Sequence, residues 1–594
     1  MRFVHTIMNS YLKNYTSLLD VSDMYLKKLR LGLYELGMLI FVVVASLLRI
    51  LLIRANWPAT NSDEATIDLM ALHIAYRGEH PIFYYGQFYM GSLEAYLGAP
   101  LIMIFGTEVF SVRLGLVLLF ALFLVCMYFL TSLLYSRKLA LFTVGLLSFG
   151  SIDVMLHQLR AIGGYPETLF FGACITLLTA ALTLTSHKTP GEPRPRWRVL
   201  IYALLGLLIG LAVWTDQLIL PFVATSGLLL LLFCYRELLR LSGLLLVIGF
   251  IIGAAPLIMY NLHATPGEAS LTILLKLQHS GASQMAAQHL SAVRQLVGSL
   301  LYALPAITGA NPLCPVEHLP LFGPHTADRL SCTLFQGGWA AGYVMLWLTS
   351  ALLACIALWN YGRKRFSAAL NYEERRELIL HSNRLMLLVG AGLTLVSYTL
   401  SPQSALVPGP TSRYLICLLI ATPAILWPLW KGLSILTTRA RKRGIPWFIA
   451  STAALVFIAM MFVMGTIRTF QDIPTAQATY AQQDTLTRDL LRINATRIYS
   501  DYWTCNRIIF QSNEHIICSA LKERLQPGQD RYKPYHDSVK ADGQAAYVFS
   551  VGSPQAKTLE KDLASQKNGH WQRYVFDGYV VYLPGPDSIQ PGGA

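Results

Sequence analysis

Charged side chains are scarce in this sequence. Asp, Glu, Lys and Arg make up 13% of its 594 residues, about half of the share that soluble domains carry, whereas hydrophobic residues make up 54%. The hydrophobic residues also gather in long runs, such as 31–53, 109–135 and 241–260, each near or above the length that crosses about 30 Å of hydrocarbon. Because a soluble globular fold could not bury such runs, the composition predicts an α-helical polytopic membrane protein.

A cleavable signal and a framework of cysteines are also missing. Residues 1–30 are mixed and polar, and the first apolar run is too long for the core of a signal peptide. Five of the nine cysteines fall inside apolar runs, where a thiol behaves as a small hydrophobic group: Cys126, Cys174, Cys234, Cys355 and Cys417. The pairs Cys314–Cys332 and Cys505–Cys518 could each close a disulfide in an oxidising compartment, and the sequence leaves both pairings open.

The distribution of positive charge orients the predicted crossings. With the N-terminus inside, the inner segments hold 24 Lys and Arg residues and the outer loops hold 7. Because basic residues resist translocation, this split indicates a cytoplasmic N-terminus in the plasma (inner) membrane, and it explains the net charge of +14 without a nucleic-acid partner. About eleven crossings are expected, at 31–53, 109–134, 138–152, 165–186, 199–214, 217–234, 241–261, 338–360, 383–400, 414–430 and 446–467.

The outer loops contain further helical patterns. The run 91–106 is apolar, but a crossing there would carry the later basic clusters outside, so we interpret it as a juxtamembrane or re-entrant helix in the outer loop 54–108. In the outer loop 261–337, the stretches 271–277 and 292–304 predict helices along the membrane surface, with simple packing over the bundle as the alternative.

An odd number of crossings places the C-terminal region outside. Residues 468–594 are polar, and they follow the transmembrane region 31–467 and the cytoplasmic segment 1–30. Their β-prone stretches predict strands at 497–500, 515–518 and 546–551 and a hairpin over 571–582 that turns at Asp577–Gly578. We therefore expect a small extracytoplasmic α/β domain, with a disordered end at 587–594.

Acidic residues gather at the expected outer boundary. Asp63 and Glu64 closely follow the first crossing, and Glu167 begins a later crossing. Charged groups near hydrocarbon are costly, so they usually have a partner or a function. A helix start at Ser62, with the two acids in its first turn, is the structural alternative for the first pair.

Aromatic and amide side chains follow in the same loop. Tyr84, Tyr85 and Gln87 combine apolar rings and polar tips, which suit sugar faces and membrane interfaces alike. They are candidate substrate contacts, as is Asp216 in a tight turn between two crossings, with an interfacial belt as the alternative. Glu94 lies near the start of the predicted juxtamembrane helix.

Two isolated basic residues complete the set. Arg160 and Arg413 are each the only basic residue of their outer loop. A guanidinium matches the geometry of phosphate, so we predict that both, with Tyr414, bind the phosphate of a lipid-linked donor. The alternatives are an ion pair of Arg160 with Asp153 or Glu167 and an ordinary interfacial anchor at Arg413.

These residue types suit the displacement of a sugar from a polyprenyl phosphate at the membrane surface. The reaction needs a carboxylate that deprotonates or orients the acceptor, and it needs cations or a metal at the leaving phosphate. Asp63, Glu64 and Glu167 can supply the first, and Arg160 and Arg413 can supply the second. Because no nucleotide-sugar domain is visible, a lipid-linked donor is the natural choice.

The order of these motifs resembles the membrane-integral glycosyltransferases of the GT-C superfold. It is most similar to the bacterial relatives of protein O-mannosyltransferases, lipid A aminoarabinose transferase and lipopolysaccharide-core galacturonosyltransferases (glycosyltransferase family 39-like). The motifs that carry the resemblance are Asp-Glu-Ala at 63–65, Tyr-Tyr-Gly-Gln at 84–87, Phe-Gly-Thr-Glu-Val-Phe-Ser-Val-Arg-Leu at 105–114, Arg-Ala-Ile-Gly-Gly-Tyr-Pro-Glu at 160–167 and Ser-Arg-Tyr-Leu at 412–415.

The resemblance implies an inverting transfer from a polyprenyl-phosphate sugar to a protein, lipid or glycan of the cell envelope. Asp63 matches the catalytic aspartate of the first loop, and Glu167 falls where relatives carry a second acid. Some relatives bind a divalent metal through a first-loop glutamate, which makes Glu94 the candidate metal ligand.

Two other function classes stay open. A lipid or sugar transporter, such as a flippase, would show paired repeats or charged, broken helices at mid-membrane, whereas here no repeat is evident and the apolar runs are nearly free of charge. A non-enzymatic scaffold would bind a cell-surface partner through the α/β domain. Deletion of 470–594 would then abolish function, while Asp63 and Glu167 would be dispensable.

Overall fold

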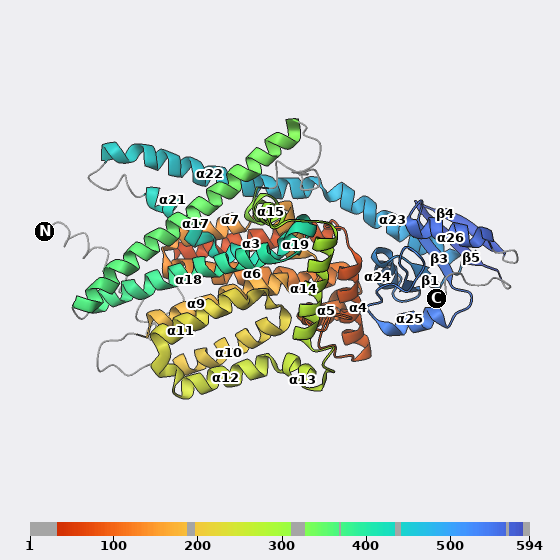
Figure 1. Cartoon of the computed structure of the whole chain (residues 1–594), viewed down its shortest axis with the longest axis horizontal. Helices are drawn as coiled ribbons and strands as arrows, with labels where there is room; N and C mark the ends of the chain where they lie inside the picture. The colour runs from red at the N-terminus through yellow and green to blue at the C-terminus, as the bar shows by residue number, and fades with distance from the viewer. Residues whose placement is uncertain are drawn as a thin grey trace.

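A helical body and a small α/β domain make up the protein. The computed structural model describes residues 32–186, 197–310, 327–367, 370–433, 441–565 and 570–585. The two parts follow one another along the long axis of the molecule (Figure 1). The expected segment 1–30, Cys314 and the expected end 587–594 lie outside the described residues.

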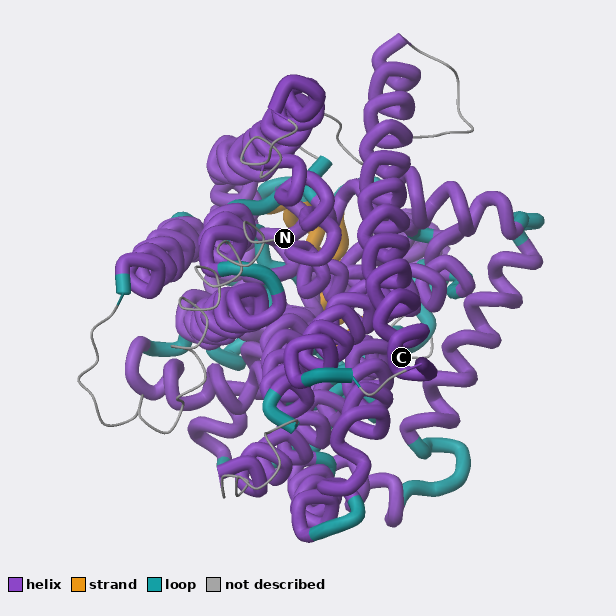
Figure 2. Tube along the Cα trace, turned by 90° about the vertical axis from the view of Figure 1, so that its left-hand side faces the viewer, coloured by secondary structure: helices purple, strands orange, loops and turns teal. Residues whose placement is uncertain are grey.

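Long apolar helices form the body. Nine segments of the described chain are long and apolar enough to cross a membrane: Leu33–Arg54 (α3), Val109–Leu134 (α6), Tyr165–Leu184 (α9), Trp197–Thr215 (α10), Gln217–Leu238 (η2 and α11), Leu330–Lys364 (within α17, Ala327–Ser367), Tyr372–Leu400 (α18), Pro408–Leu433 (α20, η5 and α21) and Ile445–Arg492 (α22, Arg441–Gln471, and α23, Ile473–Arg492). Most of these helices lie along one direction, so Figure 2 shows many of them end-on.

Three helix pairs are bent at short breaks. They are Arg137–Leu147 with Ile152–Leu159 (α7 and α8, 84°), Leu241–Gly253 with Ala255–His263 (α12 and α13, 64°) and Ser270–Ala287 with Ala292–Thr308 (α14 and α15–α16, 114°). The expected crossing 138–152 covers α7 but ends at the first residue of α8, whereas the expected crossing 241–261 covers most of the second pair. The third pair lies where surface helices were expected. The described residues therefore offer nine to twelve crossings, in agreement with the expected eleven.

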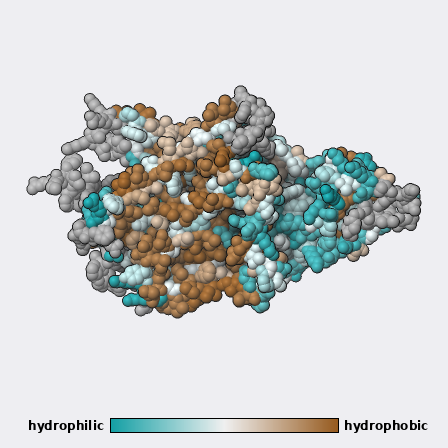
Figure 3. Space-filling model, in the orientation of Figure 1, coloured by the Kyte–Doolittle hydropathy of each residue, from teal (hydrophilic) through white to brown (hydrophobic). Residues whose placement is uncertain are grey.

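The surface of the body matches its composition. On the face shown in Figure 3, hydrophobic residues cover the helices, whereas hydrophilic residues cover the α/β domain. Exposed large side chains such as Leu47, Leu118, Leu232, Ile252 and Leu352 project from several of the predicted crossings. An apolar surface of this extent suits lipid rather than water.

Two shorter helices lie between the body and the α/β domain (Figure 1). They are α4 (Ser62–Arg77) and α5 (Leu93–Phe105). At a rise of about 1.5 Å per residue, the 13 residues of α5 span only about 20 Å, too short to cross the bilayer. The position of α5 agrees with the expected juxtamembrane helix.

The C-terminal domain contains a mixed sheet of five strands in the order β2-β1-β3-β5-β4. The strands are Arg497–Ser500 (β1), Ile517–Ala520 (β2), Ala546–Ser550 (β3), Trp571–Phe576 (β4) and Tyr579–Pro584 (β5), with helices Tyr502–Gln511 (α24), Lys533–Lys540 (α25) and Pro554–Ser565 (α26). β1 is parallel to β2 and β3, and β5 is antiparallel to β3 and β4. The predicted hairpin turns at Asp577 and Gly578, both with positive φ, as such a tight turn requires. The α/β fold expected here is confirmed.

The domain shares its core with α4. Ala65 and Leu69 of α4 belong to the same hydrophobic cluster as the sheet and α24. Asn506 of α24 also donates a hydrogen bond to Thr66 Oγ1 at 2.9 Å. Within the domain, a disulfide between Cys505 and Cys518 ties α24 to β2. The α/β domain is therefore packed onto α4 rather than tethered loosely.

Candidate active site

Asp63 lies in the first turn of α4. The Asn61 side chain caps this helix, with its Oδ1 2.9 Å from the amide nitrogen of Glu64. Ser62 is thus the first helical residue and not the cap. A carboxylate in a first turn is stabilised by the positive end of the helix dipole, so the local sequence favours an acid at this position.

Three side chains meet at Oδ1 of Asp63. The Tyr84 hydroxyl donates to it at 3.4 Å and to the Asp63 carbonyl at 3.1 Å. From the α/β domain, the Tyr502 hydroxyl donates to the same oxygen, and Arg531 Nη2 lies 3.1 Å from it. The Asp63 side chain stays 21% exposed, and Oδ2 has no hydrogen-bond partner among the described residues. Asp63 is held through one oxygen and open at the other.

Glu64, expected as a second catalytic carboxylate, has a structural role instead. It is fully buried, with Oε1 2.7 Å from Arg113 Nε and Oε2 2.6 Å from Arg113 Nη2. Oε1 also accepts a hydrogen bond from the Ala161 amide at 3.2 Å. Because both oxygens are occupied and shut away from solvent, Glu64 is not placed to take a proton from a substrate.

The aromatic stretch expected to bind sugar contacts the α/β domain. The Gln87 side-chain oxygen accepts hydrogen bonds from Arg531 Nη1 at 2.9 Å and Nη2 at 3.2 Å in the amide orientation that gives both groups a partner. The Arg531 guanidinium also lies over the Tyr84 ring, 4.8 Å from its centroid. Tyr85 donates to Glu79 at 2.6 Å. Tyr84 and Gln87 therefore contact the α/β domain through Arg531, and sugar binding by these three side chains stays a prediction.

Arg160 follows α8 at the same boundary. Its Nη2 donates to the Ala59 carbonyl at 2.6 Å, and its Nε has no hydrogen-bond partner among the described residues. Burial lowers the pKa of this guanidinium to about 10, and the nearby charges of Arg413 and Arg507 act in the same direction. Arg160 thus adds a free N–H donor to a region where positive charges gather.

Arg413 begins η5 (Ser412–Ala421) beside two aromatic rings. Its guanidinium carbon lies 5.4 Å from the ring centroid of Tyr165 and 5.7 Å from that of Tyr414. It interacts electrostatically with Asp63 and Asp216. Its Nε also lacks a hydrogen-bond partner in the described part of the chain. Arg413 therefore interacts with two carboxylates of the candidate site, those of Asp63 and Asp216.

Asp216 connects Arg413 to the second acidic position. Its Oδ1 accepts a hydrogen bond from the Leu218 amide at 2.9 Å. Its carboxylate packs so closely on Gly164 that a Cβ there would lie 2.7 Å from Oδ2. Burial raises the pKa of Asp216 to about 6. Because Asp216 also interacts electrostatically with Glu167, one chain of charges runs from Asp63 through Arg413 to Glu167.

Glu167 and Glu94 form a buried pair of carboxyl groups. The two groups interact with each other, and Glu94 Oε2 accepts a hydrogen bond from the Gly163 amide at 2.9 Å. Burial, reinforced by the charge of Glu167, raises the pKa of Glu94 well above its ordinary range. Glu94 Oε1 and Glu167 Oε2 have no hydrogen-bond partner among the described residues.

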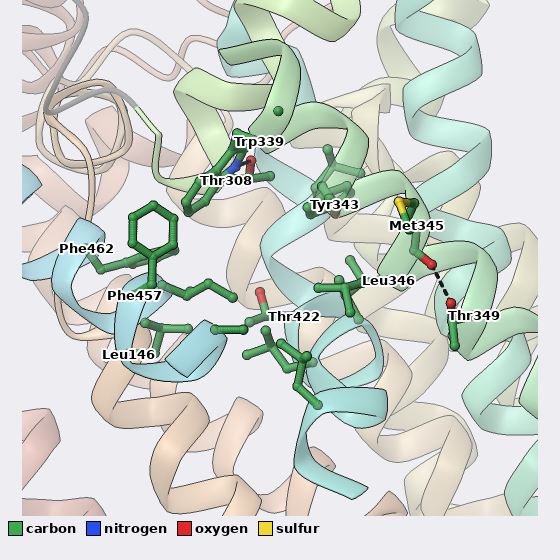
Figure 4. A pocket seen from close by; sticks show the side chains of 18 of the residues that line it. Leu146, Thr308, Trp339, Tyr343, Met345, Leu346, Thr349, Thr422, Phe457 and Phe462 are labelled. Atoms are coloured by element: carbon green, nitrogen blue, oxygen red, sulfur yellow. Dashed lines mark hydrogen bonds between the residues drawn. The ribbon is translucent and has the colours of Figure 1, made fainter. Parts of the chain in front are cut away.

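An apolar groove of about 570 Å³ opens between α17, η5–α21 and α22 (Figure 4). Its walls include Phe335, Trp339, Leu418, Leu419, Phe457 and Phe462. Trp339 Nε1 donates to Thr308 Oγ1 at 2.9 Å, as the close-up shows. Because a 3₁₀ helix rises about 2 Å per residue, Leu418 lies about 10 Å along η5 from Arg413. The helix η5 thus contains both the Arg413 guanidinium and residues that line the apolar groove.

Comparison with known proteins extends this picture. By sequence, the chain matches no known protein family and no curated protein. By structure, it is similar to ArnT from Cupriavidus metallidurans bound to undecaprenyl phosphate, at 14% identity and a TM-score of 0.52, over 93% of this chain and 99% of that chain. The chain has the GT-C fold. The archaeal oligosaccharyltransferase AglB from Archaeoglobus fulgidus, in complex with an inhibitory peptide and a dolichol-phosphate, matches at 14% identity and a TM-score of 0.46, over 92% and 74% of the two chains.

Metal binding by Glu94 stays a prediction. Its carboxyl group interacts with that of Glu167. In the described ranges, no group of three His, Cys, Asp or Glu side chains could hold a metal ion. We therefore derive no step through a metal ion.

Four residues around the GT-C site escaped the sequence analysis. Tyr502 and Arg531 contact Asp63 across 439 and 468 positions of the sequence, and Arg507 interacts electrostatically with Arg160. No local pattern marks such contacts. Arg113 could have been identified from the sequence, because it belongs to the 105–114 motif and a lone arginine in an apolar run needs an acidic partner.

Proposed function

We propose that this chain is a glycosyltransferase that moves a sugar from a polyprenyl-phosphate donor to a cell-envelope acceptor on the outer face of the plasma (inner) membrane. The observation that carries the proposal is the placement of Asp63. Its Oδ2 is open at the boundary between the apolar body and the hydrophilic domain, and Arg413 interacts with it electrostatically. The similar ArnT structure, which contains undecaprenyl phosphate, supports this class of donor.

The donor lies along η5 in this proposal. Arg413 and Arg160 bind its phosphate, each with an Nε–H that has no other partner among the described residues, and Tyr414 stands beside Arg413. The polyprenyl chain lies in the apolar groove farther along the same helix. The two parts of the site thus match the two parts of a lipid phosphate.

Asp63 acts on the acceptor. Its Oδ2 takes the proton of the acceptor hydroxyl or amine as that atom bonds to the anomeric carbon of the sugar. The bond from this carbon to the phosphate oxygen breaks, and its electron pair leaves with the polyprenyl phosphate. The phosphate gains one negative charge, which Arg160 and Arg413 stabilise in a site of limited solvent access. Attack opposite to the leaving group inverts the anomeric configuration.

Two observations support the outer location. The basic residues of the sequence concentrate in the segments assigned to the cytoplasm. The α/β domain contains the Cys505–Cys518 disulfide, and disulfides persist mainly in oxidising compartments. The first supports a cytoplasmic N-terminus, and the second supports an α/β domain outside the cytoplasm.

A transfer assay tests the proposal. The purified protein in liposomes is given polyprenyl-phosphate sugars and an envelope extract, and labelled sugar in the acceptor fraction is measured. We expect transfer by the wild type and a loss of about 10²–10⁴-fold in Asp63→Asn, because an amide cannot accept the proton. Movement of donor across the vesicle membrane without any transfer would instead indicate a flippase.

Asp68 provides a matched control on the same helix. It is fully buried, neither carboxylate oxygen has a hydrogen-bond partner among the described residues, and burial raises its pKa well above the ordinary range. Asp68→Asn therefore removes the same group from α4 without touching the open carboxylate. We expect it to keep transfer within a few fold. Equal losses in both variants, or full activity in Asp63→Asn, would refute the role of Asp63.

A further inference from the structure

We infer that the α/β domain completes the active site, with Tyr502 and Arg531 acting as positioning residues for Asp63. This inference rests on the proposed function, because it assigns a role through the proposed base. Neither residue has to contact the sugar. Their role is to fix which oxygen of Asp63 faces the acceptor.

The contacts form a closed network around one oxygen. The Tyr502 hydroxyl donates to Asp63 Oδ1, and Arg531 Nη2 lies 3.1 Å from the same atom. Arg531 Nε in turn donates to the Tyr502 hydroxyl oxygen at 2.8 Å. Arg531 is only 6% exposed, since Gln87 accepts from its other end and the Tyr84 ring lies against its face. Each group in the network restrains the next.

The domain that carries these residues is itself fixed. Asn506 bonds to Thr66, and the Tyr532 hydroxyl donates to Glu79 at 2.7 Å on the other side of the interface. Ala65 of α4 is buried in the core of the domain. Tyr502 and Arg531 therefore contact Asp63 from a domain that is packed onto α4, the helix that contains Asp63.

Pinning one oxygen has a chemical consequence. An aspartate carboxylate can rotate about its last side-chain bond, and a rotated carboxylate misplaces the atom that must accept the proton. Three donors at Oδ1 leave Oδ2 as the oxygen presented to the acceptor. Misplacement of a reacting group by about 1 Å can cost about 10²-fold in rate.

Steady-state kinetics of Arg531→Ala and Tyr502→Phe test the inference. We expect kcat to fall about 10–100-fold, with the KM for the donor changed by less than about threefold, because the binding groups for the phosphate stay in place. Arg531→Lys should recover only part of the loss, since an ammonium cannot reproduce the planar fork that reaches Asp63, Tyr502 and Gln87 together.

The decisive measurement combines the variants with Asp63→Asn. If Arg531 and Tyr502 act through Asp63, then adding either change to Asp63→Asn lowers the residual rate by less than about twofold. Losses that multiply would show that these residues act independently of Asp63 and would overturn the inference. A merely structural role predicts such multiplication as well.

Asn506→Ala serves as the control for domain docking. It removes a hydrogen bond of the same interface without contact to Asp63, and we expect kcat within about twofold of the wild type. If kcat falls as far in Asn506→Ala as in Arg531→Ala, the loss in both variants comes from weaker docking of the domain, and the inference is overturned. Should Arg531→Ala not fold, Tyr502→Phe decides alone, because it deletes a single oxygen. A wild type without transfer refutes the proposed function itself, whereas an active wild type with unaffected variants refutes only this inference.

Discussion

Arg113 of α6 donates two hydrogen bonds to the carboxylate of Glu64 of α4, from Nε to Oε1 at 2.7 Å and from Nη2 to Oε2 at 2.6 Å, in a site closed to solvent. The pair joins α4 to the membrane-spanning helix α6 directly beside Asp63. Adjacent acids on one helix thus have opposite environments, because Glu64 is sealed in an ion pair while Asp63 has an open oxygen. Sequence adjacency gives no hint of this division.

This ion pair makes a prediction about stability. Glu64→Gln leaves the Arg113 charge buried without its partner, so we expect a loss of about 3–5 kcal/mol in the free energy of unfolding. Asp63→Asn should lose much less, because the Asp63 side chain is partly exposed and an amide oxygen still accepts hydrogen bonds. Thermal unfolding in detergent measures both. A shift in Asp63→Asn as large as that in Glu64→Gln would contradict the assignment of roles.

The apolar groove predicts a dependence on the chain length of the donor. Gly338 and Gly342 line the groove, and a Cβ at either position would meet no atom within 4 Å. Gly338→Phe should occupy tail space and raise the KM for a long-chain donor about tenfold, the equivalent of about two buried methylene groups. The KM for a short-chain analogue should not change.

Gly362 on the same helix supplies the control for this change. A Cβ there also meets no atom within 4 Å, but the residue does not line the groove. Gly362→Phe should leave both KM values unchanged. Equal increases for long and short donors in Gly338→Phe would place the tail elsewhere.

The disulfide predicts a sensitivity to reductant. Cys505 and Cys518 are 13 positions apart, and closing a loop of this size contributes about 3 kcal/mol in the chain-entropy account. Because α24 carries Tyr502, a strong reductant or Cys518→Ala should lower both the unfolding temperature of the α/β domain and the transfer rate. Cys355→Ser, at an exposed free thiol, should change neither. Unaltered stability after complete reduction would contradict this prediction.

The contact of Glu514 with α4 predicts a dependence on pH. Burial alone would raise the pKa of Glu514, but hydrogen bonds from His73 and Tyr535 and the charges of His73 and Arg77 outweigh it and lower the pKa to about 2. A lowered carboxyl pKa stabilises the fold above the unfolded value of about 4.5, and this contribution disappears as the pH falls toward 2. After allowance for solvent screening it amounts to about 1–2 kcal/mol.

Denaturant unfolding between pH 6 and about 2.5 tests this contribution. Glu514→Gln should be less stable than the wild type at pH 6 and should approach it at the acidic end. Glu523→Gln, at an exposed carboxyl of the same domain, should run parallel to the wild type throughout. A constant difference between Glu514→Gln and the wild type across the range would rule out the titration of Glu514 as its source.

Local patterns were enough for the elements of the fold. Apolar runs predicted the crossings because a helix needs a fixed length of hydrocarbon-compatible residues, and alternation with a two-residue turn predicted the hairpin at Asp577–Gly578. The bends were harder to see. The break between α7 and α8 lies inside one expected crossing, because an apolar run has the same composition whether the helix is straight or bent.

What the sequence determined by itself is a polytopic helical membrane protein with two adjacent acids soon after the first crossing and an α/β domain at its C-terminal end. Only the tertiary structure decided which acid is open, since Arg113 seals Glu64 while Tyr502 and Arg531 hold one oxygen of Asp63. The physical reason is the distance along the sequence over which the interactions act. Helix formation and membrane insertion depend on neighbours along the chain, whereas the availability of a carboxylate depends on charges and donors that folding brings from more than 400 positions away.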